Sequence, residues 1–100
     1  MEFVYEQALE AYMKKKGKKV IAVEVVTSNN SDFEVTELHV RFLNEKMARA
    51  FREKKHFRSH KTELGEVLLP PYRLEYEDKV VFGLKSFLGM KYITHQGMKL

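Results

Sequence analysis

Apolar residues recur at helical spacing in two stretches of this chain. Over residues 2–16 they fall on one stripe of a helical surface. The members of this stripe are Val4, Tyr5, Ala8, Leu9, Tyr12 and Met13. Gly17 is the expected end of the helix. A second helix is predicted over residues 45–55, with Asn44 as its N-cap and Met47, Ala48, Ala50 and Phe51 on its apolar face.

Between the two helices the pattern changes to that of a β-hairpin. Residues 19–27 are β-branched and mostly apolar, which predicts a strand buried on much of both faces. Residues 28–32 have the composition of a turn, and residues 33–43 alternate as a second, antiparallel strand. Because the alternation changes phase within this second strand, a β-bulge is expected near Thr36 and Glu37.

The second half of the chain contains shorter strand signals. Residues 56–63 are polar and basic, and we expect them to form a loop. A short strand follows over residues 64–69 and ends at Pro70 and Pro71. Later strands are predicted over residues 72–77, 80–84 and 90–94, with a turn at 77–79 and a loose tail after Gly97.

The predicted element order is α-β-β-α-β-β-β, or the same order with one extra strand in the second half of the chain. Neither a composition shift nor a low-complexity linker divides the chain, so residues 1–100 are expected to form a single α+β domain. The pattern favours two layers, in which two helices cover one face of a mostly antiparallel sheet of about five strands.

Composition narrows the class of protein further. Of the 100 residues, 44% are hydrophobic and 32% are charged, which is typical of a globular domain. The absence of cysteine excludes disulfides, thiolate metal sites and cysteine nucleophiles. Because neither a signal peptide nor a bilayer-spanning segment is evident, we expect a cytoplasmic protein with no membrane partner.

Positive charge is concentrated in two clusters, which contain eleven of the 18 lysine and arginine residues. The larger cluster consists of Arg49, Arg52, Lys54, Lys55, Arg58 and Lys61. The smaller cluster consists of Lys14, Lys15, Lys16, Lys18 and Lys19. The net charge of +4 arises in residues 51–100, because residues 1–50 carry equal numbers of basic and acidic side chains. Clustered cations attract polyanions, above all the phosphates of nucleic acids.

The larger cluster is the predicted nucleic-acid-binding surface. Arg49 and Arg52 are expected on one face of the second helix, and the other cations extend this surface into the following loop. Phe57 lies among them and could stack on an exposed base. About five phosphate contacts would give a slope of roughly −4 to −5 for log affinity against log salt. The alternative is an ordinary solvated face, since cations favour the dipole at a helix C-terminus.

The smaller cluster gains support as a partner contact only if folding places it beside the larger one. Two aromatic residues, Tyr72 and Tyr76, occupy alternate strand positions and could form a flat binding stripe, although burial in the core is the alternative. His56 and His60 have the i,i+4 spacing of a helical metal pair, but the surrounding cations would repel a dication.

The sequence therefore favours a non-catalytic binding protein without a metal or cofactor, whose partner is nucleic acid or another polyanion. The second hypothesis is a protein-interaction or regulatory module, acting as a homodimer or on a protein partner through a sheet edge or the Tyr72/Tyr76 strand. A metal-dependent nuclease is the third, with Glu77 and Lys79 completed by Asp32 or Glu24.

Overall fold

The computed structural model describes residues 1–29 and 32–100, and within them it contains two helices and seven strands. The helices are α1 (Gln7–Lys16) and α2 (Glu45–Glu53). The strands are β1 (Glu2–Tyr5), β2 (Val20–Asn29), β3 (Glu34–Leu43), β4 (Arg58–Thr62), β5 (Gly65–Leu69), β6 (Glu75–Phe87) and β7 (Met90–Lys99). The α+β class is confirmed, but the number and arrangement of strands differ from the prediction.

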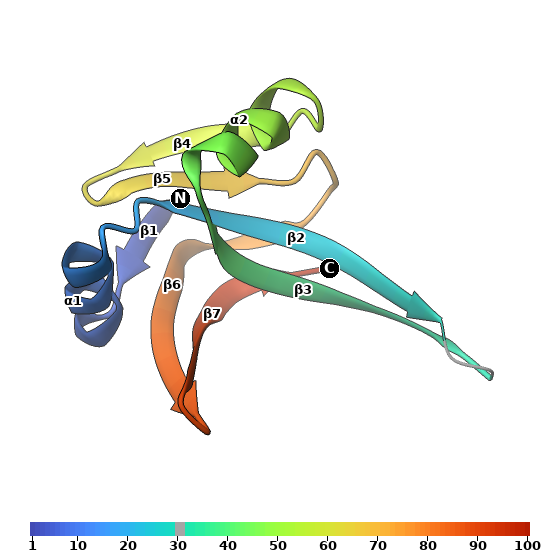
Figure 1. The fold of residues 1–100 in the computed structure, drawn as a ribbon. Coiled ribbons are helices and arrows are strands. Elements are labelled where there is room, and N and C mark those ends of the chain that lie inside the picture. The colour runs from blue at the N-terminus through green and yellow to red at the C-terminus, as the bar shows by residue number, and fades with distance from the viewer. Residues whose placement is uncertain (30–31) are drawn as a thin grey trace.

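The strands form two mixed sheets, so the expected single five-stranded sheet is wrong (Figure 1). One sheet has the order β3-β2-β5-β4, in which β2 and β5 are parallel and the other pairs are antiparallel. The other sheet has the order β1-β6-β7, in which β1 is parallel to β6 and β7 is antiparallel to it. The segment between β5 and β6 carries the chain from the first sheet to the second.

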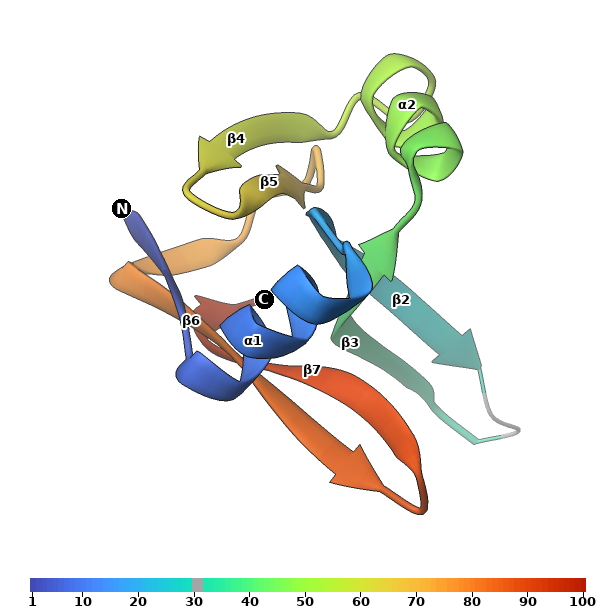
Figure 2. The same ribbon diagram turned by 60° about the vertical axis from the view of Figure 1, so that its left-hand side comes forward.

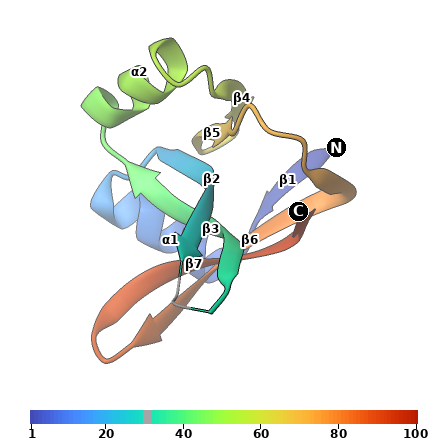
Figure 3. The ribbon, with the colours of Figure 1, turned by 90° about the vertical axis from the view of Figure 1, so that its right-hand side faces the viewer.

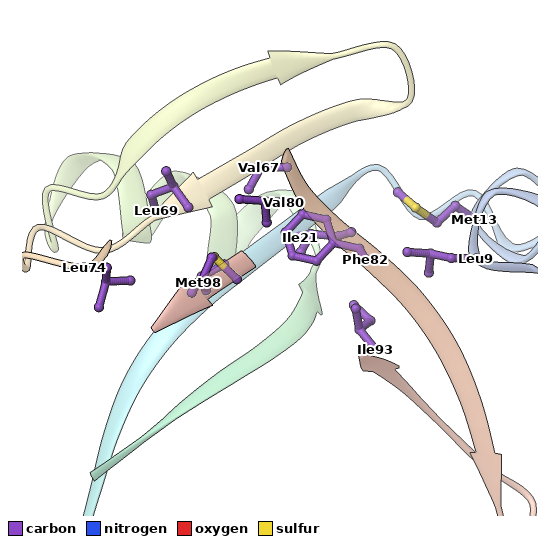
Figure 4. Close-up of a cluster of buried hydrophobic side chains, with 11 residues drawn as sticks. Leu9, Met13, Ile21, Val67, Leu69, Leu74, Val80, Phe82, Ile93 and Met98 are labelled. Atoms are coloured by element: carbon purple, nitrogen blue, oxygen red, sulfur yellow. The ribbon is translucent and has the colours of Figure 1, made fainter. Parts of the chain in front are cut away.

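The main core lies between the two sheets and α1 (Figure 4). Ile21 and Val23 point into it from β2, and Val67 and Leu69 point into it from β5. The three-stranded sheet contributes Phe82, whose ring is fully buried. The core also contains Leu9, Met13, Leu74, Val80, Ile93 and Met98. Burying this apolar surface is the main stabilising contribution to the fold.

A second core lies on the opposite face of the four-stranded sheet, under α2. It contains Val20 and Ala22 of β2, Leu68 of β5, and Ala48 and Phe51 of α2. Because successive residues of a strand point to opposite faces, β2 and β5 contribute apolar side chains to both cores, and β5 also places Glu66 on the α2 side. α2 therefore packs on one face of this sheet, whereas α1 packs against β6 and adds Leu9 and Met13 to the core on the other face (Figures 2 and 3). The predicted placement of both helices on one face is wrong.

The predicted helix ends are mostly confirmed. Gly17 ends α1 with a left-handed backbone (φ 68°), and its N–H donates to the Met13 carbonyl. The Asn44 side chain caps α2 by accepting a hydrogen bond of 2.8 Å from the Met47 N–H. At the other end of α1, however, residues 2–5 form a strand rather than the first helical turn. Their parallel pairing with β6, far along the chain, outweighs the helical spacing of their apolar side chains.

Three other expectations are corrected. The β2–β3 ladder keeps a continuous register from Val20↔Leu43 to Asn29↔Glu34, so no bulge occurs at Thr36 and Glu37. The turn expected at residues 28–32 lies partly outside the described residues. The expected loop at residues 56–63 contains β4. The expected turn at residues 77–79 lies within β6, where the pairing with β7 becomes irregular between Tyr76 and Val81.

The expected loose tail is also ordered, because β7 continues to Lys99. Gly97 makes this possible, since its backbone is left-handed (φ 92°) and a Cβ there would overlap the Lys79 carbonyl oxygen of β6. Among the described residues, neither helix combines the length and apolar character needed to cross a membrane.

Because Gly97 packs closely against β6, replacing it should destabilise the protein more than replacing Gly89, which lies in the open β6–β7 turn. Gly97→Ala should lower the free energy of unfolding by about 3 kcal/mol, because backbone strain and the overlap with Lys79 act together. Gly89→Ala is the matched control: its φ is 82°, but no atom would lie within 4 Å of the added Cβ, so a loss of about 1 kcal/mol is expected. Urea denaturation followed by circular dichroism measures both, and equal losses would contradict this role of Gly97.

Candidate functional site

The structure divides the six predicted binding cations among different surroundings. Arg49 and Lys54 are exposed on and just after α2. Lys55 is also exposed, and its ammonium lies 4.4 Å from the centre of the Phe51 ring. On β4, Lys61 points to the α2 side of the sheet and Arg58 to the other side, because the two residues have opposite parity along the strand. The cations therefore do not form one continuous surface.

Arg52 is held in a network of ion pairs around the buried Glu66. Its Nε lies 3.1 Å from one Glu66 carboxylate oxygen, and its Nη2 lies 3.1 Å from Glu45. The Ser59 hydroxyl donates to the same Glu66 oxygen, and the Lys61 ammonium lies 3.8 Å from it. Glu66 is 4% exposed, so these groups compensate a carboxylate that has lost its water. Arg52 thus joins α2 to β5 and is unavailable for a phosphate.

Arg58 instead faces an open depression of about 500 Å³ between the α2–β4 loop and the β5–β6 loop. The lining residues are His56, Arg58, Pro71, Tyr72, Arg73, Leu74 and Tyr76, and none of them is acidic. Among the described residues, neither Arg58 nor Arg73 forms an ion pair. We call this depression the Arg58/Arg73 groove. Part of the predicted basic cluster and the predicted tyrosine stripe meet here.

The two tyrosines of the Arg58/Arg73 groove have different environments. Tyr72 is 60% exposed, so one face of its ring is open to a ligand. Tyr76 is half-buried, and burial raises the pKa of its hydroxyl, while the nearby Arg58 guanidinium partly opposes that shift. Within the described residues its buried oxygen has no hydrogen-bond partner of good geometry, which leaves a polar group in the groove unsatisfied.

The groove continues past Tyr72 into a second depression, of about 350 Å³. Tyr72 and Pro71 line both, and the second adds Lys55, Phe57, Val25 and Glu24. The Glu24 carboxylate already accepts hydrogen bonds from Nε and Nη2 of Arg41, at 2.9 and 3.1 Å. Phe57 packs on Phe51 with ring centroids 4.7 Å apart, so it supports the second core rather than standing free for a base.

The smaller lysine cluster lies at the other end of β5. Its lysines lie in the last turn of α1 or directly after it. Lys18 and Lys19 line a small depression together with Leu64, which belongs to the β4–β5 turn. The Lys19 carbonyl accepts a hydrogen bond of 2.9 Å from the Glu66 N–H, which places this cluster near Lys61. It is remote from Arg58 and Arg73, because Arg58 pairs with Leu69 at the opposite end of β5 and Arg73 follows that end. The fold therefore places it beside only one member of the larger cluster.

The histidine pair is not arranged as a helical metal site. His56 lies in the α2–β4 loop with a left-handed backbone (φ 59°), whereas His60 lies on β4 and packs its ring against Phe3, with centroids 5.7 Å apart. Among the described residues, no group of three histidine or acidic side chains is placed to hold a metal ion. Glu77 lies on β6 of the three-stranded sheet, and Glu24 lies on β2 of the other sheet.

Sequence reasoning missed two residues that matter here. Arg73 stands between Tyr72 and Leu74, and only the β5–β6 connection turns it toward Arg58. The second is Glu66, which follows a glycine in a short strand and whose carboxylate is buried under α2. One sequence signal could have found it, because a lone acid among apolar strand residues needs a cation partner when both faces of the strand are buried.

Comparison with known proteins adds no family to this description. The chain matches no protein-family model, no curated protein and no solved structure.

The network around Glu66 makes a prediction about stability. Glu66→Ala should lower the free energy of unfolding by about 3 kcal/mol, because it leaves Arg52 partly buried without its main partner. Glu45→Ala removes the other carboxylate that pairs with Arg52. Because the Glu45 side chain is 69% exposed, this variant should lose less than about 1 kcal/mol of unfolding free energy. Urea denaturation of both variants tests this difference, and a loss for Glu66→Ala no larger than that for Glu45→Ala would contradict it.

Proposed function

We propose that this protein binds single-stranded nucleic acid along the Arg58/Arg73 groove. The observation that carries the proposal is the lining of that groove, where two unpaired arginines, a histidine and two tyrosines converge without a carboxylate among the described residues. Proteins that bind single strands combine such cations, which contact the backbone, with aromatic rings on which bases stack.

Each side chain has a distinct role in this proposal. Arg58 and Arg73 contact successive phosphates, and Lys55 extends the positive track beyond Tyr72. The exposed Tyr72 ring offers a stacking surface between the two depressions. The Tyr76 hydroxyl is buried beside the Arg58 guanidinium, so its role is to orient Arg58 rather than to contact the ligand.

The groove is open and shallow rather than a closed pocket, which suits an extended chain better than an enclosed small molecule. Duplex DNA would need a helix or ribbon that enters a groove of the duplex, whereas the Arg58/Arg73 groove is lined mainly by the α2–β4 and β5–β6 loops. Single strands can instead turn their bases toward Tyr72. Nucleic acid therefore stays the proposed partner, but the binding surface moves from α2 to the α2–β4 and β5–β6 loops.

The electrostatic part of the proposal predicts a modest salt dependence. Arg52 and Lys61 are engaged with Glu66, so three or four cations remain to contact phosphates. Fluorescence anisotropy with a short labelled single strand should then give a slope of about −2 to −3 for log affinity against log salt. A slope near zero would contradict binding through the backbone.

Two sets of variants locate the site. Arg58→Ala combined with Arg73→Ala should weaken binding by tenfold or more, as two charged contacts are lost. Tyr72→Ala should weaken it roughly tenfold, whereas Tyr72→Phe, which keeps the ring, should bind as the unchanged protein does.

The control for these variants is Lys15→Ala combined with Lys16→Ala, which removes the same charge from the end of α1, far from the groove. Its binding should change little. Equal weakening by both double variants would mean that binding depends only on net charge, and normal binding by the Arg58/Arg73 variant would rule out this groove.

A further inference from the structure

The tip of the β6–β7 hairpin exposes three large apolar side chains to water. Leu88 is 86% exposed, Met90 72% and Phe87 65%. The end of this hairpin projects away from β4 and β5 (Figures 1 and 2). Scattered exposed apolar residues are common on protein surfaces, but three together at a projecting tip form a patch that indicates contact with an apolar partner.

The turn itself carries a residue that the backbone does not favour. Phe87 pairs with Met90, so Leu88 and Gly89 form a two-residue turn, and both have left-handed backbones, with φ of 51° and 82°. Asparagine or aspartate followed by glycine suits this turn best, because a short polar side chain tolerates the conformation and is hydrated. Leucine is disfavoured here both by its backbone and by its exposure to water.

Positive charge lies directly behind this apolar tip. Lys85 and Lys91 lie on β6 and β7, and the Lys91 ammonium donates to the Ser86 hydroxyl at 3.4 Å. Neither lysine forms an ion pair with a described residue. Residues 79–100 carry four lysines and no acidic residue, so the whole hairpin beyond Asp78 is positive. Tyr92, paired with Lys85, is half-exposed beside them.

We infer that this hairpin tip inserts into the surface of a bilayer that contains anionic lipids. Phe87, Leu88 and Met90 would enter the boundary between headgroups and acyl chains, while Lys85 and Lys91 would remain at the level of the anionic headgroups. Tyr92 has the amphipathic ring that is favoured at that interface. A convex apolar tip with a basic rim is complementary in charge to such a surface, and it needs no matching groove on a partner.

This inference departs from the expectation of no membrane partner, which rested on the lack of a spanning segment. Interfacial insertion requires only a few apolar side chains and nearby cations. The inference is independent of the proposed nucleic-acid site, because the tip and the groove lie at opposite ends of β6.

Binding of the full chain to sedimented vesicles tests the inference. Vesicles of phosphatidylcholine with phosphatidylserine should bind the protein, and vesicles of phosphatidylcholine alone should bind it much less. Leu88→Asn should lower the partition coefficient roughly tenfold or more, because it removes the most exposed apolar side chain. The same variant should be at least as stable to heat as the unchanged protein, because Asn-Gly suits the turn.

The contribution of charge has its own comparison. Lys85→Gln combined with Lys91→Gln should weaken binding to the anionic vesicles by about tenfold. Lys14→Gln combined with Lys15→Gln makes the same change of net charge on α1 and should have little effect. If Leu88→Asn binds these vesicles as tightly as the unchanged protein, the tip does not insert and the inference is wrong.

Insertion can also be seen directly. The chain lacks tryptophan, so Phe87→Trp places a single reporter at the tip, and its emission should shift to the blue with anionic vesicles. No shift would overturn the inference. Sedimentation velocity tests the other occupant. If the unchanged protein is a dimer that Leu88→Asn dissociates, and it does not bind vesicles, the tip forms a contact between two copies instead. Oligonucleotide binding by Leu88→Asn should stay normal, which separates this test from that of the groove.

Discussion

The structure depends on the burial of one short strand, β5, on both of its faces. Leu69 and Val67 pack toward the three-stranded sheet, while Leu68 packs under α2. The backbone N–H and C=O groups of such a buried strand need hydrogen-bond partners along both edges. β5 finds these partners in β2 and β4. These pairings fix the layers of the molecule and the directions in which β4 and the β5–β6 connection leave the core.

The candidate binding groove follows from that arrangement. β5 ends at Leu69, and the two prolines that follow cannot continue the ladder, so the chain turns toward the other sheet. The turn brings Tyr72 and Arg73 opposite Arg58, the first residue of β4. On the opposite face of the four-stranded sheet from Arg58, the buried Glu66 of β5 pairs with Arg52 and so holds α2 and the loop that contains His56. One arginine of the basic cluster thus supports the site while another lines it.

The long strand β6 separates two surfaces of different chemistry. At its start lies the Arg58/Arg73 groove, which is polar, aromatic and concave. At its end lies the β6–β7 tip, which is apolar, convex and rimmed by lysine. Both surfaces are positive, and we propose a different negatively charged partner for each: single-stranded nucleic acid for the groove and a lipid interface for the tip.

Sequence alone determined the features that depend on near neighbours. The Asn44 cap, the Gly17 helix end, the β2–β3 hairpin and the apolar character of β5 were all predicted, because capping, backbone freedom and alternation act within a few residues. Only the tertiary structure decided that residues 2–5 pair with β6 and that the strands divide into two sheets, since pairing partners far apart leave no local signal. The same limit applied to the site. The sequence showed that Arg52 and Arg58 are cations, but whether a cation meets a buried carboxylate or an open groove is set by which strands the fold brings beside it.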